Sequence, residues 1–418
     1  MREAVWDIRT LLSPYRVLDL TNETGFMCGK MLADLGADVI KVERPGGDDS
    51  RKIGPFYNNI SDSQKSLYWF AYNTNKRGIT LDIESLAGRN IFRTLVGKAD
   101  FILETYAPGY LDKLELSYSS LKVLNPKLIM VSITPFGQTG PYKDRKGADI
   151  VHMAEGGLMY ITGDPDRPPL RMGGNQSHFL AGIHAAAGAL IAHYYRMLTG
   201  QGQHVDISIQ EAVLRFGYSI LPWIAGRGIS ETRRGNVVLR GNAYQRDVWS
   251  CKDGYVLWRF MGGIWGVQDW TALVKWIDEK GKAGILKEVD WATIDMSKLS
   301  QAEVDSWNNI VQDFFNDHTK DEIQNEALKR GLKILKVYSP KDVFESSHLQ
   351  SRGYWTHIEH PELNRSITYP AFIFLSNETS CAVNRRAPLI GEHNDQIYKK
   401  DIGLSLLEAE KLKKDCII

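Results

Sequence analysis

The sequence predicts an α/β protein whose larger part is built around a parallel sheet. Short apolar runs alternate with helical patterns through the first 135 residues, which is the rhythm of strands and crossover helices in a parallel sheet. The chain of 418 residues has 43% hydrophobic and 24% charged residues, values typical of a folded globular protein. A chain of this length is expected to form about two or three domains.

The strands of the sheet are predicted where the chain is apolar enough to be buried on both faces. These runs are residues 17–20, 39–43, 99–104 and 128–134. Helical patterns lie between them, at residues 27–35, 86–97 and 118–124. An alanine-rich helix is predicted over residues 179–198, where the TGQGQ sequence ends it.

The pattern of the chain changes near Pro222. Residues 246–260 alternate around the turn sequence KDG, which is typical of a β hairpin. Helices are predicted at residues 267–280, 301–316 and 320–331, a further strand at 368–376, and a short amphipathic helix at 404–415. We therefore predict a large domain in residues 1–222, a small α+β domain in residues 223–335, and a C-terminal segment of mixed character in residues 336–418.

Composition and charge exclude several classes of function. Lysine and arginine total 51 against 50 for aspartate and glutamate, so the net charge does not indicate a nucleic-acid or anionic-membrane partner. The four cysteines lie far apart, without a CxxC pair, so neither a disulfide framework nor a structural zinc site is expected. The N-terminus lacks the apolar core of a signal peptide, and the most apolar segment contains His184, His193 and Arg196. We expect a cytoplasmic protein with reduced thiols that binds neither a metal ion nor a membrane.

The loop after the first predicted strand does not carry a dinucleotide-binding motif. Gly25, Gly29 and Gly36 do not have the GxGxxG spacing, which argues against an NAD-dependent oxidoreductase. Four basic residues further along could bind phosphate groups, because guanidinium and ammonium groups suit phosphate oxygens: Arg44, Arg51, Lys76 and Arg77. The alternative is a solvated charged surface, the common fate of charged residues, and composition leaves both interpretations open.

Five motifs resemble the class III CoA-transferase family, the CaiB/BaiF type, which includes formyl-CoA and carnitine CoA-transferases and α-methylacyl-CoA racemases. The motifs follow one another from about residue 14 to 215, and they read VLDLTNETGFMCGKMLADLGADVIKVERPGGDD, NTNKRGITLD, ADFILETYAPGYLDKL, LNPKLIMVSITPFGQTGPY and TGQGQHVDISIQEAV. The resemblance implies a Rossmann-like large domain completed by the C-terminal segment, a small α+β domain between, and two chains interlocked in a dimer.

The resemblance also assigns residues to coenzyme A. Arg44 takes the family's position beside the adenosine phosphates, and Leu81 lies on the stretch that contacts adenine. Tyr106 and Lys113 fall in the segment that lines the CoA channel. Lys113 replaces a usual arginine and lacks the bidentate fork of that residue. A CoA thioester is therefore the expected substrate, and no covalently bound cofactor is implied.

The position of the family's nucleophile is occupied by a histidine. Family transferases use an aspartate that attacks the acyl-CoA thioester and then holds CoA as an enzyme thioester. Counting forward from the Pro168–Pro169 pair and backward from TGQGQ, both counts arrive at His178. An imidazole can attack a thioester, but it has no carbonyl carbon that could carry CoA. We therefore predict that His178 lines the pocket or the core without a catalytic role.

Other residues could in principle replace the missing aspartate. Glu155 and Asp164 are nearby carboxylates in a loop-rich stretch, although surface carboxylates are the commoner case. The racemase chemistry of the family is not favoured, because Ala148 stands where its histidine would be, although Asp149 is kept. The nearest candidate for the family's glycine-rich loop is MGGIWG, residues 261–266.

The resemblance and the missing aspartate together predict a non-catalytic subunit of a heteromeric CoA-transferase. In heteromeric members of this kind, two related chains pair and one carries the aspartate. The expected partner is therefore a homologous, aspartate-containing catalytic subunit, and the complex would move CoA from succinyl-CoA to an aromatic dicarboxylate such as (R)-benzylsuccinate. Two alternatives stay open: an active CoA-transferase or acyl-CoA isomerase that uses another residue, and a module that binds CoA without turnover.

Overall fold

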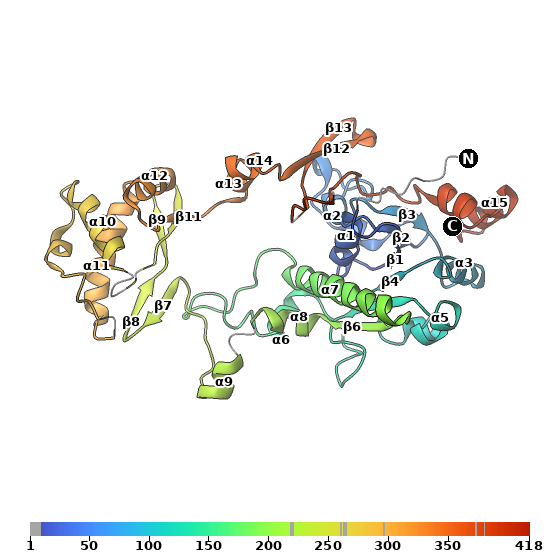
Figure 1. The fold of residues 1–418 in the computed structure, drawn as a ribbon, viewed down its shortest axis with the longest axis horizontal. Coiled ribbons are helices and arrows are strands. Elements are labelled where there is room, and N and C mark those ends of the chain that lie inside the picture. The colour runs from blue at the N-terminus through green and yellow to red at the C-terminus, as the bar shows by residue number, and fades with distance from the viewer. Residues whose placement is uncertain are drawn as a thin grey trace. The chain divides into compact units, whose positions relative to one another are not determined.

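The computed structural model describes residues 10–418 except 218–220, 260, 262–265, 296, 373 and 380. The chain divides into two compact units (Figure 1). The large unit comprises residues 1–159, 171–230 and 349–418, and the small unit comprises residues 160–170 and 231–348. The large unit is thus assembled from three separate segments of the sequence.

A parallel sheet forms the centre of the large unit, which confirms the predicted α/β fold. Its strand order within the described residues is β3-β2-β1-β4-β5-β6. The strands are β1 (Arg16–Leu20), β2 (Asp38–Glu43), β3 (Arg77–Thr80), β4 (Phe101–Glu104), β5 (Ile129–Thr134) and β6 (His204–Ser208). Leu18 of β1 pairs with Ile40 of β2 and with Ile102 of β4. The order reverses between β1 and β4, and ligands of such sheets bind beyond the carboxyl ends of the strands at this point.

One face of the sheet is covered by α1 (Phe26–Asp34) and α7 (Gln176–Thr199), which lie side by side (Figure 1). Both helices can approach closely because α7 presents small residues to the core, among them Ala181 and Ala185. A Cβ atom on Gly182 would lie 2.5 Å from the Cβ atom of Met27, so this approach requires glycine. α7 is followed by β6 and then by α8 (Ile209–Phe216).

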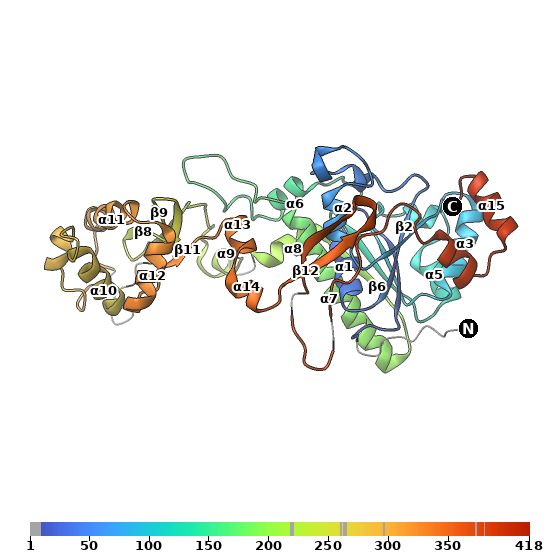
Figure 2. The ribbon, with the colours of Figure 1, turned by 90° about the horizontal axis from the view of Figure 1, so that it is seen from above.

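The opposite face is covered by α3 (Leu86–Val96), α5 (Tyr118–Leu124) and α15 (Leu406–Lys414), which Figure 2 shows close together. α15 and the residues before it come from the C-terminal segment, so the end of the chain completes this layer. Asn394 Nδ2 donates to Thr80 Oγ1 at 2.8 Å, and the Asp82 N–H donates to the carbonyl oxygen of Ile417 at 2.8 Å. These bonds tie the C-terminal segment to the edge strand β3.

Shorter elements complete the large unit. They are α2 (Leu67–Tyr72), α4 (Tyr110–Lys113), α6 (Asp149–Glu155), α9 (Leu221–Arg227) and the hairpin of β12 (Trp355–His360) with β13 (Arg365–Pro370). In the sequence, α14 (Ser347–Ser351) spans the boundary between the two units. The strand predicted at residues 368–376 is confirmed over residues 368–370 and is wrong at residues 371, 372 and 374–376. β13 ends at Pro370 because this residue pairs with Trp355, the first residue of β12; the Ala371 N–H still donates to the carbonyl oxygen of Tyr354 at 2.7 Å.

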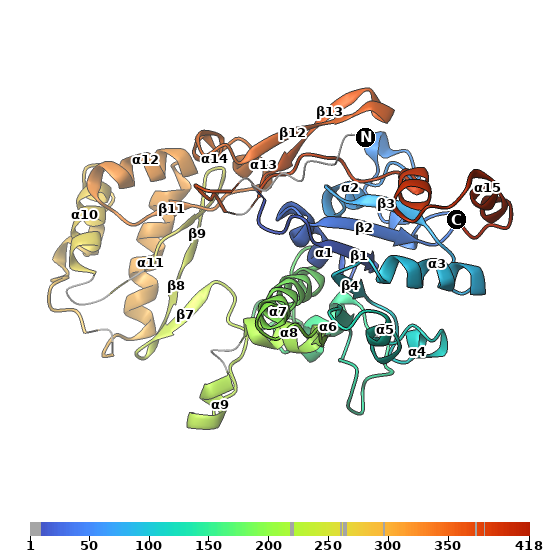
Figure 3. The ribbon, with the colours of Figure 1, turned by 45° about the vertical axis from the view of Figure 1, so that its right-hand side comes forward.

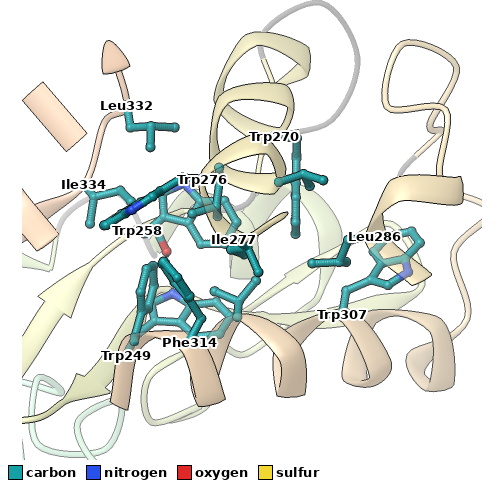
Figure 4. Packing of buried hydrophobic residues seen from close by; sticks show 14 of the residues in the cluster. Trp249, Trp258, Trp270, Trp276, Ile277, Leu286, Trp307, Phe314, Leu332 and Ile334 are labelled. Carbon is teal, nitrogen blue, oxygen red and sulfur yellow. Dashed lines mark hydrogen bonds between the residues drawn. The ribbon is translucent and has the colours of Figure 1, made fainter. Parts of the chain in front are cut away.

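The small unit is an α+β structure (Figure 3). Its strands are β7 (Val237–Arg240) with β8 (Ala243–Arg246), and β9 (Val248–Cys251), β10 (Gly254–Leu257) and β11 (Leu335–Lys336). Its helices are α10 (Val267–Asp278), α11 (Gln301–Asn316), α12 (Lys320–Arg330) and α13 (Pro340–Phe344). Tryptophans dominate its core (Figure 4); the rings of Trp270 and Trp291 stack with centroids 3.9 Å apart. In this unit, therefore, buried tryptophans serve packing.

Among the residues that the structure describes, no helix is both long enough and apolar enough to span a membrane.

Candidate functional site

The loops that follow β1 and β4 meet at the point where the strand order of the sheet reverses. The Asn22 N–H, after β1, donates to Thr105 Oγ1, after β4, at 2.9 Å. Parallel strands place their carboxyl ends at one edge of the sheet, so the residues after β1, β2, β3 and β4 line a common border. The residues assigned to CoA by resemblance, Arg44, Leu81, Tyr106 and Lys113, all follow one of these strands.

Arg44 and Leu81 have different surroundings on this border. The Arg44 side chain is exposed; it forms an ion pair with Asp49 and donates from Nε to the carbonyl oxygen of Gly47 at 3.3 Å. Leu81 is only 2% exposed, and its N–H donates to the carbonyl oxygen of Glu43 at 2.7 Å. The Arg44 guanidinium is therefore open to a ligand, whereas the Leu81 side chain belongs to the hydrophobic core.

Tyr106 and Lys113 lie on the segment after β4. The half-buried Tyr106 ring stacks on Tyr110, with centroids 4.6 Å apart and an interplanar angle of 24°. Tyr110 in turn donates from its hydroxyl group to Glu84 Oε1 at 2.6 Å. Lys113 is the last residue of α4 and is exposed. The two residues are thus held on one short segment, Tyr106 in a fixed aromatic stack and Lys113 at its solvated end.

Three of the four basic residues considered for phosphate binding form internal ion pairs. Arg51 makes a bidentate pair with Glu43, with N–O distances of 2.6 and 2.7 Å. Lys76 Nζ donates to Asp19 Oδ2 at 2.8 Å, and neither side chain is exposed. Arg77 pairs with Asp38 at 2.6 Å. These three are neither a phosphate site nor a solvated surface, and of the four only Arg44 is exposed.

His178, predicted from the sequence to lie at the position of the family's nucleophile, is the third residue of α7 and is 7% exposed. Neither of its ring nitrogens has a hydrogen-bond partner among the described residues, and both are shielded from solvent. Burial lowers the pKa of His178, with a smaller opposing effect from Asp149 and Glu23. Burial therefore favours the neutral form of the ring.

Asp149, the first residue of α6, is a buried carboxylate, and both of its oxygen atoms accept hydrogen bonds. Its Oδ1 atom accepts the N–H and the hydroxyl group of Ser177, both at 2.9 Å, and its Oδ2 atom accepts Arg171 Nε at 2.6 Å. Burial alone would raise the pKa of Asp149, but the bonds from Arg171 and Ser177 outweigh it and lower that pKa. A carboxylate stabilised in this way is a weak nucleophile, and its role is to fix the start of α7.

A second histidine, His152, packs beside His178 and was not predicted. The two ring centroids lie 6.0 Å apart, and His152 Nδ1 lies 3.3 Å from Ser177 Oγ. Burial and repulsion from His178 lower the pKa of His152 to about 4. Two buried imidazoles thus lie beside each other between α6 and α7.

The remaining candidates are placed as follows. Glu155 is exposed at the end of α6, and Asp164 belongs to the small unit. Residues 262–265 of the MGGIWG sequence lie outside the described residues. Within the described part of the chain, no group of three or more His, Cys, Asp or Glu side chains could hold a metal ion.

The chain was compared with family models and with curated proteins. The family model described as CoA-transferase family III matches residues 12–394. The chain is 33% identical over 410 residues to succinyl-CoA:(R)-benzylsuccinate CoA-transferase subunit BbsE of Thauera aromatica, covering 96% of each chain. It is also 33% identical over 408 residues to succinyl-CoA–D-citramalate CoA-transferase of Chloroflexus aurantiacus, covering 96% of this chain and 98% of that protein.

Among solved structures, a CAIB/BAIF family protein from Brucella suis matches with a TM-score of 0.82 and 28% identity, over 94% of this chain and 99% of that chain. The match of the family model, the curated relatives and the fold all extend over nearly the whole chain. The chain therefore belongs to CoA-transferase family III, whose members act on CoA thioesters.

Proposed function

We propose that this chain is the non-catalytic subunit of a heteromeric class III CoA-transferase. The observation that carries the proposal is the state of His178, the residue predicted at the nucleophile position: both of its nitrogens are shielded and unpartnered among the described residues. A homologous, aspartate-containing subunit would perform the acyl transfer, with the two chains interlocked.

The chemistry of the family explains why this histidine cannot take over. An aspartate oxygen attacks the thioester carbonyl and releases CoA thiolate, which then attacks the aspartyl carbonyl carbon to give an enzyme thioester and the free acid. An imidazole nitrogen could form an acyl-imidazole in the first step. It offers no carbonyl carbon to the thiolate, so CoA could not be retained for the acceptor acid. The cycle therefore stops after one half-reaction.

For the substrates we propose succinyl-CoA as donor and an aromatic dicarboxylate such as (R)-benzylsuccinate as acceptor. Support comes from the two relatives, whose names share succinyl-CoA as the donor and differ in the acceptor, (R)-benzylsuccinate in one and D-citramalate in the other. Both acceptors are dicarboxylates. Because the two identities are equal, D-citramalate is the second candidate acceptor.

This chain would itself contribute a CoA-binding surface. Arg44, with its exposed guanidinium, and Lys113, at the solvated end of α4, would contact phosphates. The Tyr106 ring would line the channel, and Leu81 would support the adenine side from within the core. We expect the affinity to be modest, because the Arg44 guanidinium must leave Asp49 to reach a phosphate and Lys113 lacks a bidentate fork.

The test is a CoA-transfer assay with the purified chain, alone and co-expressed with an aspartate-containing paralogue. Succinyl-CoA is the donor, and (R)-benzylsuccinate and D-citramalate are assayed separately as acceptors. We expect turnover only in the mixture, loss of turnover when the partner's aspartate is replaced by alanine, and little change for His178→Ala in this chain. Turnover by the chain alone would contradict the proposal and would direct the search for a nucleophile to Glu155 and Asp164.

A further inference from the structure

Glu104, the last residue of β4, is a buried carboxyl group placed directly before the CoA-channel segment. It is 3% exposed, and its Oε2 atom accepts the backbone N–H of Tyr106 at 2.6 Å. The Ser132 side chain on β5 hydrogen-bonds to the same carboxyl group, and Ser132 Oγ lies 2.8 Å from His204 Nε2 on β6. A chain of polar groups thus runs from the Tyr106 backbone to the exposed imidazole of His204.

The carboxyl group lies at the wall of a cavity of about 260 Å³. Asp112 from α4, Tyr118 from α5 and His204 from β6 also line this cavity. Burial raises the pKa of Glu104 to about 7, the hydrogen bonds from Ser132 and Tyr106 act in the opposite direction, and the charges of Asp206 and Asp112 add to the rise. The surroundings of Glu104 therefore destabilise the ionised form of its carboxyl group.

Two contacts fix the Tyr106 segment, one through its backbone and one through its ring. Glu104 holds the N–H, and Tyr110 stacks on the ring at 4.6 Å. Thr105, between Glu104 and Tyr106, accepts the Asn22 N–H and so joins this segment to the loop after β1. Since the sheet reverses its strand order here, a shift of the Tyr106 backbone would alter the border on which a ligand lies.

We propose that Glu104 is a positioning residue for coenzyme A: its carboxyl group holds the Tyr106 backbone so that the aromatic stack lines the CoA channel. The inference rests on the proposed function, because it needs Tyr106 to contact CoA. A neutral acceptor such as a glutamine amide could hold the Tyr106 N–H without the cost of burying an ionisable group. A buried carboxyl group beside a ligand site lowers stability, and proteins commonly keep such a group because it serves function.

The experiment compares Glu104→Ala, Glu104→Gln and the control Asp112→Ala in the full-length chain. Glu104→Ala removes the acceptor, Glu104→Gln keeps an acceptor oxygen without the charge, and Asp112 lines the same cavity from an exposed position. Hydrogen exchange of the peptide that contains Tyr106 reports its N–H bond, and calorimetric titration with CoA reports affinity. We expect exchange at least about tenfold faster and CoA affinity about tenfold weaker in Glu104→Ala, with both restored by Glu104→Gln and unchanged in Asp112→Ala.

A pH series of thermal unfolding separates positioning from a structural role. The pKa of Glu104 in the folded chain lies above the ordinary value of 4.5, so the contribution of Glu104 to the stability of the wild type falls as pH rises from about 4.5 to about 7. Glu104→Gln does not titrate, and we expect its Tm to exceed that of the wild type by roughly 1–4 °C at pH 8 and to match it below about pH 5. A Tm that falls in Glu104→Gln at every pH would show a structural carboxylate and overturn the inference.

The outcomes distinguish this inference from the proposed function. If the wild-type chain binds no CoA, the proposed CoA surface fails, and the role of Glu104 fails with it. If the wild type binds CoA and Glu104→Ala binds it equally well, the CoA surface stands and only the positioning role is overturned. Unchanged hydrogen exchange in Glu104→Ala would overturn it as well.

Discussion

His178 and Glu104 are both buried titratable residues of the large unit, and the fold treats them in opposite ways. The two nitrogens of His178 have no partner among the described residues. The carboxyl group of Glu104 receives hydrogen bonds from a backbone N–H and from Ser132. An unmade hydrogen bond of a buried polar group costs about 1–3 kcal/mol, so the surroundings of His178 stabilise it poorly, whereas those of Glu104 are organised around it.

The contrast separates two regions of the large unit. On the Tyr106 border, the proposed CoA surface, the Tyr106 ring stacks on Tyr110. In the α6–α7 region, Asp149 is held by Ser177 and the imidazoles of His152 and His178 lie beside each other. Under the proposed function, the first region would bind ligand while the second would have lost its reactive carboxylate.

The largest expected effect concerns the framework of the α6–α7 region. Asp149→Ala removes the acceptor of the Ser177 N–H and hydroxyl group and of Arg171, and we expect the free energy of unfolding to fall by about 3 kcal/mol at pH 7. The pKa of Asp149 is lowered in the fold, so its contribution is present above the ordinary value of 3.8 and is lost as pH falls below it. Urea denaturation at pH 7 and at pH 3 measures both effects.

The matched control is Glu155→Ala, an exposed carboxylate at the other end of α6. It should change the free energy of unfolding by less than about 0.5 kcal/mol. Equal effects of Asp149→Ala and Glu155→Ala would show that the α6–α7 region is not organised around Asp149, and the comparison with Glu104 would lose its basis.

The sequence predicted the sheet better than the site, and particular residues show why. The strand runs at 17–20 and 39–43 are apolar because both faces of the sheet are covered, and this signal is local. β3 and β6 were not predicted: β3 has only four residues, RGIT, and β6, HVDIS, alternates polar residues because it is an edge strand with exposed positions. Burial of an edge strand depends on what covers it, which a short stretch of sequence does not encode.

The site depended on pairings that are distant in the sequence. Lys76 meets Asp19 across 57 positions and Arg16 meets Asp401 across 385, so no local pattern distinguishes such structural ion pairs from a phosphate site. His178 was found because two motif spacings agreed on it. His152 was missed because its relevance arises only once α6 is placed against α7.

A smaller effect tests whether His178 is truly without a partner. His178→Leu replaces two unsatisfied nitrogens by apolar atoms, and we expect the free energy of unfolding to rise by about 1 kcal/mol at pH 7. The pKa of His178 is lowered in the fold, so the contribution of His178 to stability falls as pH drops below about 6.5, and the leucine variant lacks this contribution. The gap between the two should widen at pH 5.

His184→Leu on the same helix is the control, because His184 Nδ1 lies 2.8 Å from the carbonyl oxygen of Leu180. That change removes a contact and should be neutral or slightly destabilising. A loss of stability in His178→Leu would reveal a bound partner for the ring, and the contrast with Glu104 would then be one of degree.

The smallest effect concerns the departure from the family at Lys113. We expect Lys113→Arg to strengthen CoA binding by about two- to fivefold, because a guanidinium group forms two parallel hydrogen bonds with a phosphate where an ammonium group acts as a point charge. Calorimetric titration with CoA measures the affinity. The control is Lys127→Arg, an exposed substitution of the same kind beyond α5, which shows the effect of replacing an ammonium by a guanidinium group at another position. If both variants bind CoA like the wild type, Lys113 does not contact a phosphate, and the ligand architecture of this chain is confined to Arg44 and the Tyr106 stack. If only Lys113→Arg binds more tightly, Lys113 contacts a phosphate of CoA, and the Tyr106 border is a working CoA surface whose affinity is limited by the missing guanidinium fork.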